Sequence, residues 1–154
     1  MSRELSVGIV GATGLVGETF RSLLEKSKHS FKELRLFASE RSEGMKIPFA
    51  GKEYVCRVLS ENCFQGLDVV FFSSGDPISK EWAPKAAEQG AIAVDNSAAY
   101  RMDQNTPLVV PEINFSEISE PTKPRVIANP NCSTIQLVML LEALKKFSLK
   151  EVRV

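Results

Sequence analysis

Three glycines at a regular spacing constrain the fold of this chain more than any other feature. Gly11, Gly14 and Gly17 follow the apolar run LSVGIV and precede the helical pattern ETFRSLLEKS. Glycine permits a tight turn and lets backbone N–H groups approach a pyrophosphate, and the following helix N-terminus adds partial positive charge. The first glycine interval is one residue longer than in the usual GxGxxG. The strand–loop–helix context predicts a dinucleotide site, with a simple tight turn as the alternative.

The rest of the chain alternates between apolar runs and helical patterns. Such alternation is typical of βαβ units, and we expect a Rossmann-like parallel sheet with helices on both faces. Residues 39–52 are polar and contain two glycines and a proline, which predicts a loop or flap. The strands are expected at 5–10, 34–38, 53–59, 67–75, 91–97 and 149–154. Residues 107–114 and 125–131 are expected to pass from a strand into a loop. The helices are expected at 18–27, at 78–90 with Gly90 as C-cap, and from Ser133.

Length and charge exclude several classes. The 154 residues suit one domain with a core, and equal numbers of basic and acidic residues give no support to general nucleic-acid or membrane binding. The N-terminal residues do not have the pattern of a signal peptide, so none is expected, and no apolar run is long enough to span a bilayer. Three cysteines without CxxC spacing argue against disulfides or zinc and favour the cytoplasm. The long turn-rich segment 101–125 serves either a site or only the surface.

The end of the second predicted strand bears on which nucleotide binds. NAD sites commonly place an acid there to hold the ribose 2′-hydroxyl. In this chain Ser39, Arg41 and Ser42 stand at that place, and arginine binds a 2′-phosphate in bidentate fashion. Glu40 is the counter-signal, because it could be the ribose acid. The sequence therefore favours NADP over NAD.

The cysteine most suited to chemistry is Cys132. Cys56 lies in an alternating strand and is expected in the core, and Cys63 has no chemical neighbour in the sequence. Cys132 follows Asn-Pro-Asn and precedes Ser-Thr, so it is expected at a helix N-terminus, where the helix dipole favours the thiolate. The free N–H groups there could also hold an oxyanion. From these residues alone, a nucleophile and a buried structural thiol both stay open.

Several motifs together resemble one family. GATGLVG, ASERSEG, FFSSG, VDNSAAYR, VVPEIN and NPNCSTIQ occur in this order over essentially the whole chain. The sequence resembles the N-terminal half of aspartate-β-semialdehyde dehydrogenases, and NPNCSTIQ and DNSAAYR are its specific parts. The related N-acetyl-γ-glutamyl-phosphate reductases typically carry a Gly-Cys-Tyr core, so NCST argues against them. Ala98 and Tyr100 are conservative departures from the family pattern.

The resemblance implies a reaction and a set of residues. NADPH would reduce L-aspartyl 4-phosphate to L-aspartate 4-semialdehyde with release of phosphate, a step toward lysine, methionine and threonine. Cys132 would form a thioester, Arg101 would bind the substrate phosphate, and Asn131 would lie beside the nucleophile. The residues implied at the cofactor are Gly11, Thr13, Gly14, Leu15, Val16, Ser39, Arg41, Ser42, Ser73, Ser74, Gly75 and Asn96; no metal site is expected.

Family members are roughly twice as long, so the chain is expected to be a fragment that ends before most of an α+β catalytic and dimerisation domain. We expect residues 1–131 to form the NADP-binding domain and residues 132–154 to lead into the catalytic domain. The missing part would hold the general-base histidine and most of a homodimer interface. His29 lies far from every motif and is not expected to be the base. Nucleotide binding without turnover is expected; a stand-alone nucleotide-binding module and a related acyl-phosphate reductase are the alternatives.

Overall fold

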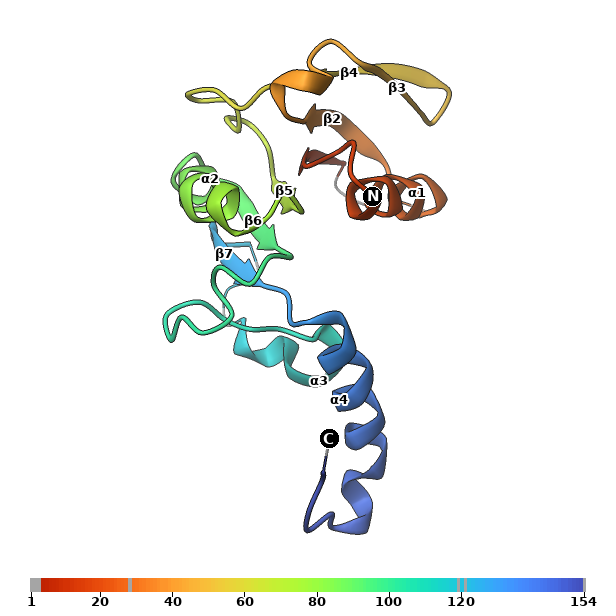
Figure 1. The fold of residues 1–154 in the computed structure, drawn as a ribbon, viewed down its shortest axis with the longest axis vertical. Coiled ribbons are helices and arrows are strands. Elements are labelled where there is room, and N and C mark those ends of the chain that lie inside the picture. Colours follow the sequence, from red (N-terminus) through yellow and green to blue (C-terminus); the bar gives the residue numbers. More distant parts are fainter. Residues whose placement is uncertain (1–3, 28, 119, 121, 154) are drawn as a thin grey trace.

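A seven-stranded sheet forms the centre of the molecule. The computed structural model describes residues 4–27, 29–118, 120 and 122–153 (Figure 1). The strand order is β3-β4-β2-β1-β5-β6-β7, and every neighbouring pair is parallel except β3 with β4. The strands are β1 (Leu5–Val10), β2 (Phe31–Phe37), β3 (Lys46–Phe49), β4 (Lys52–Arg57), β5 (Val69–Phe72), β6 (Ile92–Asp95) and β7 (Arg125–Ala128).

Helices cover both faces of the sheet, which confirms the predicted Rossmann-like class. Phe20 and Leu24 of α1 pack on one face, where Ile9 is buried. Ala83 of α2 packs on the other face, against the cluster that contains Phe72. Strand alternation sends successive side chains to opposite faces, so both apolar faces need cover. The helices are α1 (Leu15–Lys26), α2 (Asp76–Glu88), α3 (Pro111–Asn114) and α4 (Cys132–Leu144), with 3-10 turns η1 (Glu40–Ser42), η2 (Phe115–Glu117) and η3 (Lys145–Phe147).

The strand order changes direction between β1 and β5. From β1 the chain moves outward to β2 on one side, and it later returns to add β5 on the other side of β1. In open parallel sheets, ligands bind outside the carboxyl ends of the strands at such a switch point. The glycine loop after β1 and the Ser73–Gly75 loop after β5 both lie there, since Val10 pairs with Phe72.

Three local predictions are wrong. Residues 39–52 are not simply a flap, because they contain η1 and β3; Ala50 and Gly51, both with positive φ, turn the chain into a β3–β4 hairpin. Residues 107–114 contribute only a bridge at Leu108 and then the short α3. Residues 149–153 are not in a strand, and Val154 lies outside the described residues. A strand forms only beside a partner strand, and the described part of the sheet offers none there.

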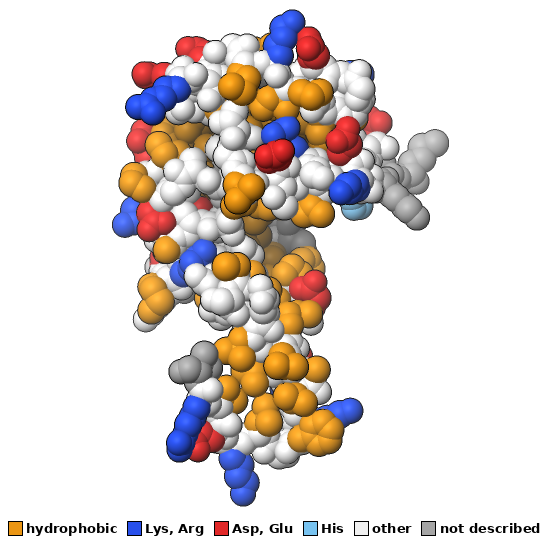
Figure 2. Space-filling view, turned by 45° about the vertical axis from the view of Figure 1, so that its right-hand side comes forward, with side chains coloured by type: hydrophobic (Ala, Val, Ile, Leu, Met, Phe, Trp, Pro, Cys, Tyr) orange, Lys and Arg blue, Asp and Glu red, His pale blue; other side chains and the backbone are white. Residues whose placement is uncertain are grey.

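The last helix extends away from the sheet (Figure 1). None of the residues of α4 is buried, although the helix is strongly apolar. Leu140 is 59% exposed and Phe147 is 67% exposed, and hydrophobic side chains gather over this part of the surface (Figure 2). The apolar segment IQLVMLL within α4 therefore forms an uncovered apolar face.

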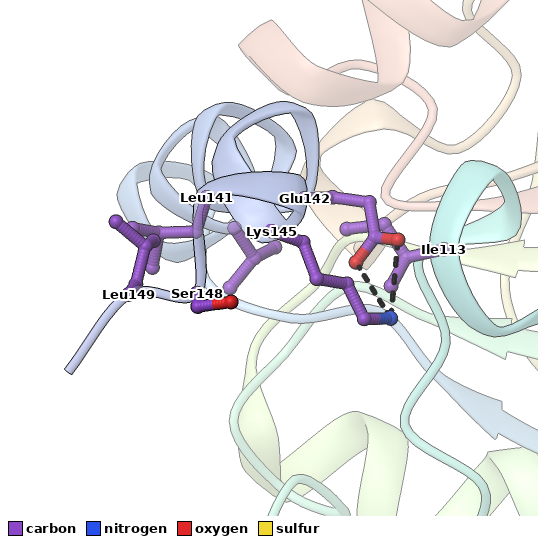
Figure 3. Close-up of a pocket in the computed structure, with 7 residues that line it drawn as sticks. Ile113, Leu141, Glu142, Lys145, Ser148 and Leu149 are labelled. Carbon is purple, nitrogen blue, oxygen red and sulfur yellow. Dashed lines mark hydrogen bonds and ion pairs between the residues drawn. The ribbon is translucent and has the colours of Figure 1, made fainter.

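A hollow of about 440 Å³ lies at the far end of this helix (Figure 3). Val138 and Leu149 contribute to its walls, and the Lys145 ammonium lies 3.3 Å from a Glu142 carboxylate oxygen. At a rise of about 1.5 Å per residue, this hollow begins well over a turn from Cys132. It therefore belongs to the uncovered surface rather than to the residues predicted to carry chemistry.

Candidate functional site

The glycine loop is held close to two neighbouring strands. The N–H groups of Gly11 and Ala12 both donate to the carbonyl of Phe37 at 3.0 Å. Gly11 has a φ of +83°, and a Cβ there would stand 3.0 Å from the Ser73 backbone. Gly17 lies in the first turns of α1, where a Cβ would come within 2.2 Å of the Gly11 carbonyl oxygen. Backbone approach therefore requires glycine at both positions.

The N-terminus of α1 faces outward from this loop. Gly14 is the N-cap, with no side chain to satisfy the first N–H groups, and Thr13 is exposed. Leu15 is 83% exposed and Val16 39% exposed, which leaves apolar surface beside free N–H donors. This combination suits a ligand with an anionic centre and apolar parts, because helix N-termini bind phosphates.

A small cavity opens beside the loop, at the switch point of the sheet. It measures about 170 Å³ and is lined by Val10, Gly11, Ala38, Ser39, Leu59, Ser74 and Ile78. The Ser74 hydroxyl is buried without a hydrogen-bond partner among the described residues, whereas the Ser73 hydroxyl donates to the Val10 carbonyl at 3.1 Å. Gly75 has a φ of +92° and is the N-cap of α2. Mostly apolar walls with one orphaned hydroxyl fit a flat heteroaromatic ring such as adenine.

The loop after β2 presents its polar side chains to solvent. Ser39 is the N-cap of η1, and its carbonyl accepts a hydrogen bond from the Ser42 N–H at 2.8 Å. Arg41 is exposed, and its guanidinium has no partner among the described residues. Glu40 is likewise exposed, and its carboxylate forms no ion pair with Arg41 in the described part of the chain. A free guanidinium at this edge is available to an anion.

The loop after β6 is fastened to its surroundings at several points. The carboxylate of Asp95 is fully buried and accepts hydrogen bonds from the N–H and the hydroxyl of Ser97 at 3.1 and 2.7 Å. The Asp76 carboxylate in α2 accepts from the Ala98 N–H at 2.8 Å. Burial, together with the nearby Asp95 carboxylate, raises the pKa of the Tyr100 hydroxyl, which donates to the Lys80 carbonyl at 3.1 Å. These contacts fix the loop immediately before Arg101.

Arg101 is oriented by carbonyls rather than by an acid. Its Nε donates to the carbonyl of Asn129 and its Nη2 to the carbonyl of Asn96, both at 3.0 Å. The Nη1 nitrogen has no partner among the described residues, and the side chain is half-buried. Asn96 also accepts a hydrogen bond at its Oδ1 from the Asn129 Nδ2 at 2.7 Å. Because no carboxylate among the described residues pairs with it, its positive charge is available to an anionic ligand.

Cys132 is exposed and is the first residue of α4. Asn131 is the N-cap, and its Oδ1 accepts from the N–H and the hydroxyl of Ser133 at 2.9 and 2.6 Å. The predicted helix start is therefore confirmed, and Asn131 has a structural duty in addition to any role toward substrate. Burial raises the pKa of the Cys56 thiol and of the Cys63 thiol. Cys56 lies in the core, as predicted.

A series of backbone hydrogen bonds joins these loops along one edge of the sheet. The N–H of Ser73 donates to Val10, that of Asn96 to Phe72 and that of Asn129 to Asp95, at 2.9, 3.0 and 2.8 Å. Parallel strands bring their carboxyl ends to the same edge. The structure thus places every predicted site residue on loops or helix starts at this edge. His29 precedes β2 and lies at the opposite edge, so it is not brought to Cys132.

Sequence reasoning missed three residues that hold the site. Asp95, Asp76 and Asn129 support the loops through the hydrogen bonds above. Asp95 could have been noticed as an acid at the end of an apolar strand, since buried carboxylates need partners. Asn129 carried no signal of its own, because its role depends on a carbonyl and on a neighbour distant in sequence.

Metal-binding clusters and membrane-spanning helices are both absent from the described residues. No group of three or more His, Cys, Asp or Glu side chains within residues 4–27, 29–118, 120 and 122–153 is placed to hold a metal ion. In the same part of the chain, no helix has the length and apolar character needed to cross a membrane.

Comparison with known proteins identifies relatives for this arrangement. Residues 6–120 match the family described as "Semialdehyde dehydrogenase, NAD binding domain". The aspartate-semialdehyde dehydrogenase of Aquifex aeolicus is 53% identical over 137 residues, which are 88% of this chain and 40% of that protein. The Bacillus subtilis enzyme of the same name is 45% identical over 146 residues, 95% of this chain and 42% of that protein. The chain thus spans less than half the length of these relatives.

Solved structures agree with the fold. The chain is similar to aspartate semialdehyde dehydrogenase II from Vibrio cholerae complexed with ASA, with a TM-score of 0.88 and 42% identity over 94% of this chain and 47% of that one. It is also similar to the Candida albicans enzyme with NADP, with a TM-score of 0.78 and 29% identity over 92% of this chain and 47% of that one. The chain belongs to the semialdehyde dehydrogenase family, and residues 6–120 are its NAD-binding domain.

Proposed function

We propose that this chain is the NADP-binding half of an aspartate-semialdehyde dehydrogenase, which reduces L-aspartyl 4-phosphate to L-aspartate 4-semialdehyde for lysine, methionine and threonine synthesis. One observation carries the proposal: the glycine loop, a carbonyl-held arginine and an exposed cysteine at a helix start share one edge of a parallel sheet. The relatives named aspartate-semialdehyde dehydrogenase support it.

The residues at the switch point fit the cofactor. Gly11, Thr13, Gly14, Leu15 and Val16 would surround its phosphates, because the loop offers backbone approach and free N–H groups. The cavity lined by Ser39 and Ser74 would take the adenosine part, and Ser73, Gly75 and Asn96 would border the remainder. When bound, the nicotinamide supplies the hydride that the reduction requires.

Arg101 and Cys132 would act on the substrate. The free Nη1 and the uncompensated charge of Arg101 suit a phosphate dianion. The Cys132 thiolate would attack the acyl carbon, the carbon–oxygen bond to phosphate would break, and a thioester would remain on the sulfur. The first N–H groups of α4 would stabilise the developing oxyanion, and Asn131 would hold that helix start in place.

We expect the proton transfers of the reaction to use a histidine, and the described residues at this edge include none. The one histidine in the sequence lies at the opposite edge of the sheet. General acid–base catalysis requires a group within hydrogen-bond reach of the reacting atoms. We therefore expect the 154-residue chain to bind nucleotide without turnover. Residues 1–131 would be the NADP-binding domain, residues 132–154 would lead into a catalytic domain, and the whole enzyme would be a cytoplasmic homodimer.

The cofactor proposal is tested by fluorescence titration of the chain with NADPH and NADH. We expect NADPH to bind at least about ten-fold more tightly, which corresponds to about 1.4 kcal/mol. Arg41→Ala should remove most of that preference by weakening NADPH alone, because only NADPH offers a 2′-phosphate. Arg153→Ala is the control, since Arg153 is exposed and pairs locally with Glu151. Equal losses for both nucleotides in Arg41→Ala would overturn the assignment of the 2′-phosphate site.

A further inference from the structure

Asn129 joins the two loops that carry Arg101 and Cys132. Its N–H donates to the Asp95 carbonyl at 2.8 Å, its side-chain Nδ2 to Asn96 Oδ1 at 2.7 Å, and its carbonyl accepts from Arg101 Nε at 3.0 Å. One residue therefore contacts the end of β6, the loop after it and the guanidinium.

Arg101 depends on the spacing between two carbonyls. Its Nε and Nη2 bind the carbonyls of Asn129 and Asn96, which belong to loops after different strands. A planar guanidinium has a fixed fork, so it turns if the two acceptors move apart or slide. The amide–amide hydrogen bond between the same two residues is the side-chain contact that holds them together.

Asn129 lies three residues before Cys132, and the segment between them is stiff. Pro130 is buried and has a fixed φ, Asn131 is the N-cap, and Cys132 begins α4. Little rotational freedom remains between the Asn129 carbonyl and the Cys132 backbone. A displacement of Asn129 would therefore move both the anchored arginine and the start of the cysteine helix.

We propose that Asn129, paired with Asn96, is a positioning residue. It fixes the position of the Arg101 guanidinium relative to the Cys132 thiol, so that an anion bound by the arginine lies beside the sulfur. The inference rests on the proposed function, because it assigns Arg101 to a phosphate group. It adds a residue whose side chain acts through Arg101 and Cys132 rather than on the substrate itself.

Inorganic phosphate and iodoacetamide test the inference in the whole chain without nucleotide. Alkylation of each cysteine is followed by peptide mass spectrometry at rising phosphate concentration. In the parent chain, phosphate should slow alkylation of Cys132 in a saturable way, and Arg101→Ala should abolish the effect. Asn129→Ala keeps the backbone carbonyl and removes the side-chain hydrogen bond to Asn96. It should therefore raise, at least about ten-fold, the phosphate concentration that halves the alkylation rate of Cys132. Asn105→Ala is the control, since the exposed Asn105 side chain has no partner among the described residues.

A second variant separates positioning from general loss of structure. Asn96→Ala removes the other half of the amide pair, so it should weaken protection similarly, and the double variant should be no worse than either single variant. Buried Cys56 reports on unfolding in the same sample, and its alkylation should stay unchanged. Unaltered protection in Asn129→Ala, additive losses, or accelerated Cys56 alkylation that accounts for the effect would each overturn the inference. Absent protection in a parent chain that still binds NADPH would overturn it while leaving the cofactor assignment intact.

Discussion

Replacing Gly17 by Ala tests the geometry of the glycine loop most directly. An added Cβ would lie 2.2 Å from the Gly11 carbonyl oxygen and 2.9 Å from the Ala12 Cα. Both neighbours are backbone atoms of the turn, so no flexible side chain can yield. To regain an ordinary contact, α1 and the turn must separate by about 1 Å.

The expected cost follows from two opposing effects. Alanine favours a helix over glycine by about 1 kcal/mol, which would stabilise the variant if the site were open. Overpacking against backbone costs about 3 kcal/mol at the upper end of the usual range. The net loss is therefore about 2 kcal/mol, which lowers the melting temperature of a chain of this size by about 4–8 °C.

Thermal unfolding by circular dichroism and NADPH titration measure the two consequences. The melting temperature should fall by the amount above, and NADPH affinity should fall at least about ten-fold because the N–H donors move with the turn. Gly14→Ala is the matched control: Gly14 has a φ of −80°, and its added Cβ would stand 3.4 Å from the same oxygen. It should lose at most about 1 kcal/mol as a poorer N-cap. A Gly17→Ala chain as stable as the parent, or less perturbed than Gly14→Ala, would refute the reasoning.

Three further perturbations follow from the structure. Arg35 donates hydrogen bonds to Glu33 and lowers the pKa of that carboxyl, so the pair stabilises the fold at neutral pH and this stabilisation is lost as pH falls. Glu33→Gln should therefore flatten the acid side of a curve of stability against pH, and an unchanged curve would contradict this. Iodoacetamide should label exposed Cys132 well before Cys56, whose pKa burial raises, and denaturant should remove the difference; equal native rates would contradict the burial. Leu140→Glu should reduce self-association in sedimentation while changing stability by less than about 0.5 kcal/mol, because Leu140 is 59% exposed; a marked loss of stability would show that the side chain is covered.

Much of the fold was predictable because several of its strands are apolar runs that alternate with helical patterns. The apolar run VVFF at β5 precedes the helical pattern of α2, and a parallel sheet follows from such alternation together with chirality and short connections. The β3–β4 hairpin was missed since its turn is Ala50-Gly51 rather than a strong Asn-Gly signal, and Pro48 lies within β3. An edge strand tolerates proline where a central strand does not, and edge position is not visible in the sequence.

The site was predictable only in part, for a related reason. Glycine spacing and a cysteine at a helix start are local features, so both could be inferred from residues that are neighbours in the sequence. The anchoring of Arg101 by the carbonyls of Asn129 and Asn96 is not local, because main-chain acceptors are present at every residue. Only the fold determines which carbonyls an arginine contacts, and no residue type in the sequence predicts that contact.

The exposure of α4 bears on how a complete site would be assembled. Cys132 begins a helix that has no buried residue, so its sulfur stands at the margin between a packed sheet and an uncovered apolar surface. Arg101 is held on the sheet side of that margin through the loops after β6 and β7. We expect a segment that covered α4 to be able to bring an acid–base group to the Cys132 sulfur, because Cys132 is exposed. Under the proposed function, we therefore expect the sheet edge to hold cofactor and substrate phosphate and the proton chemistry to depend on what packs against α4.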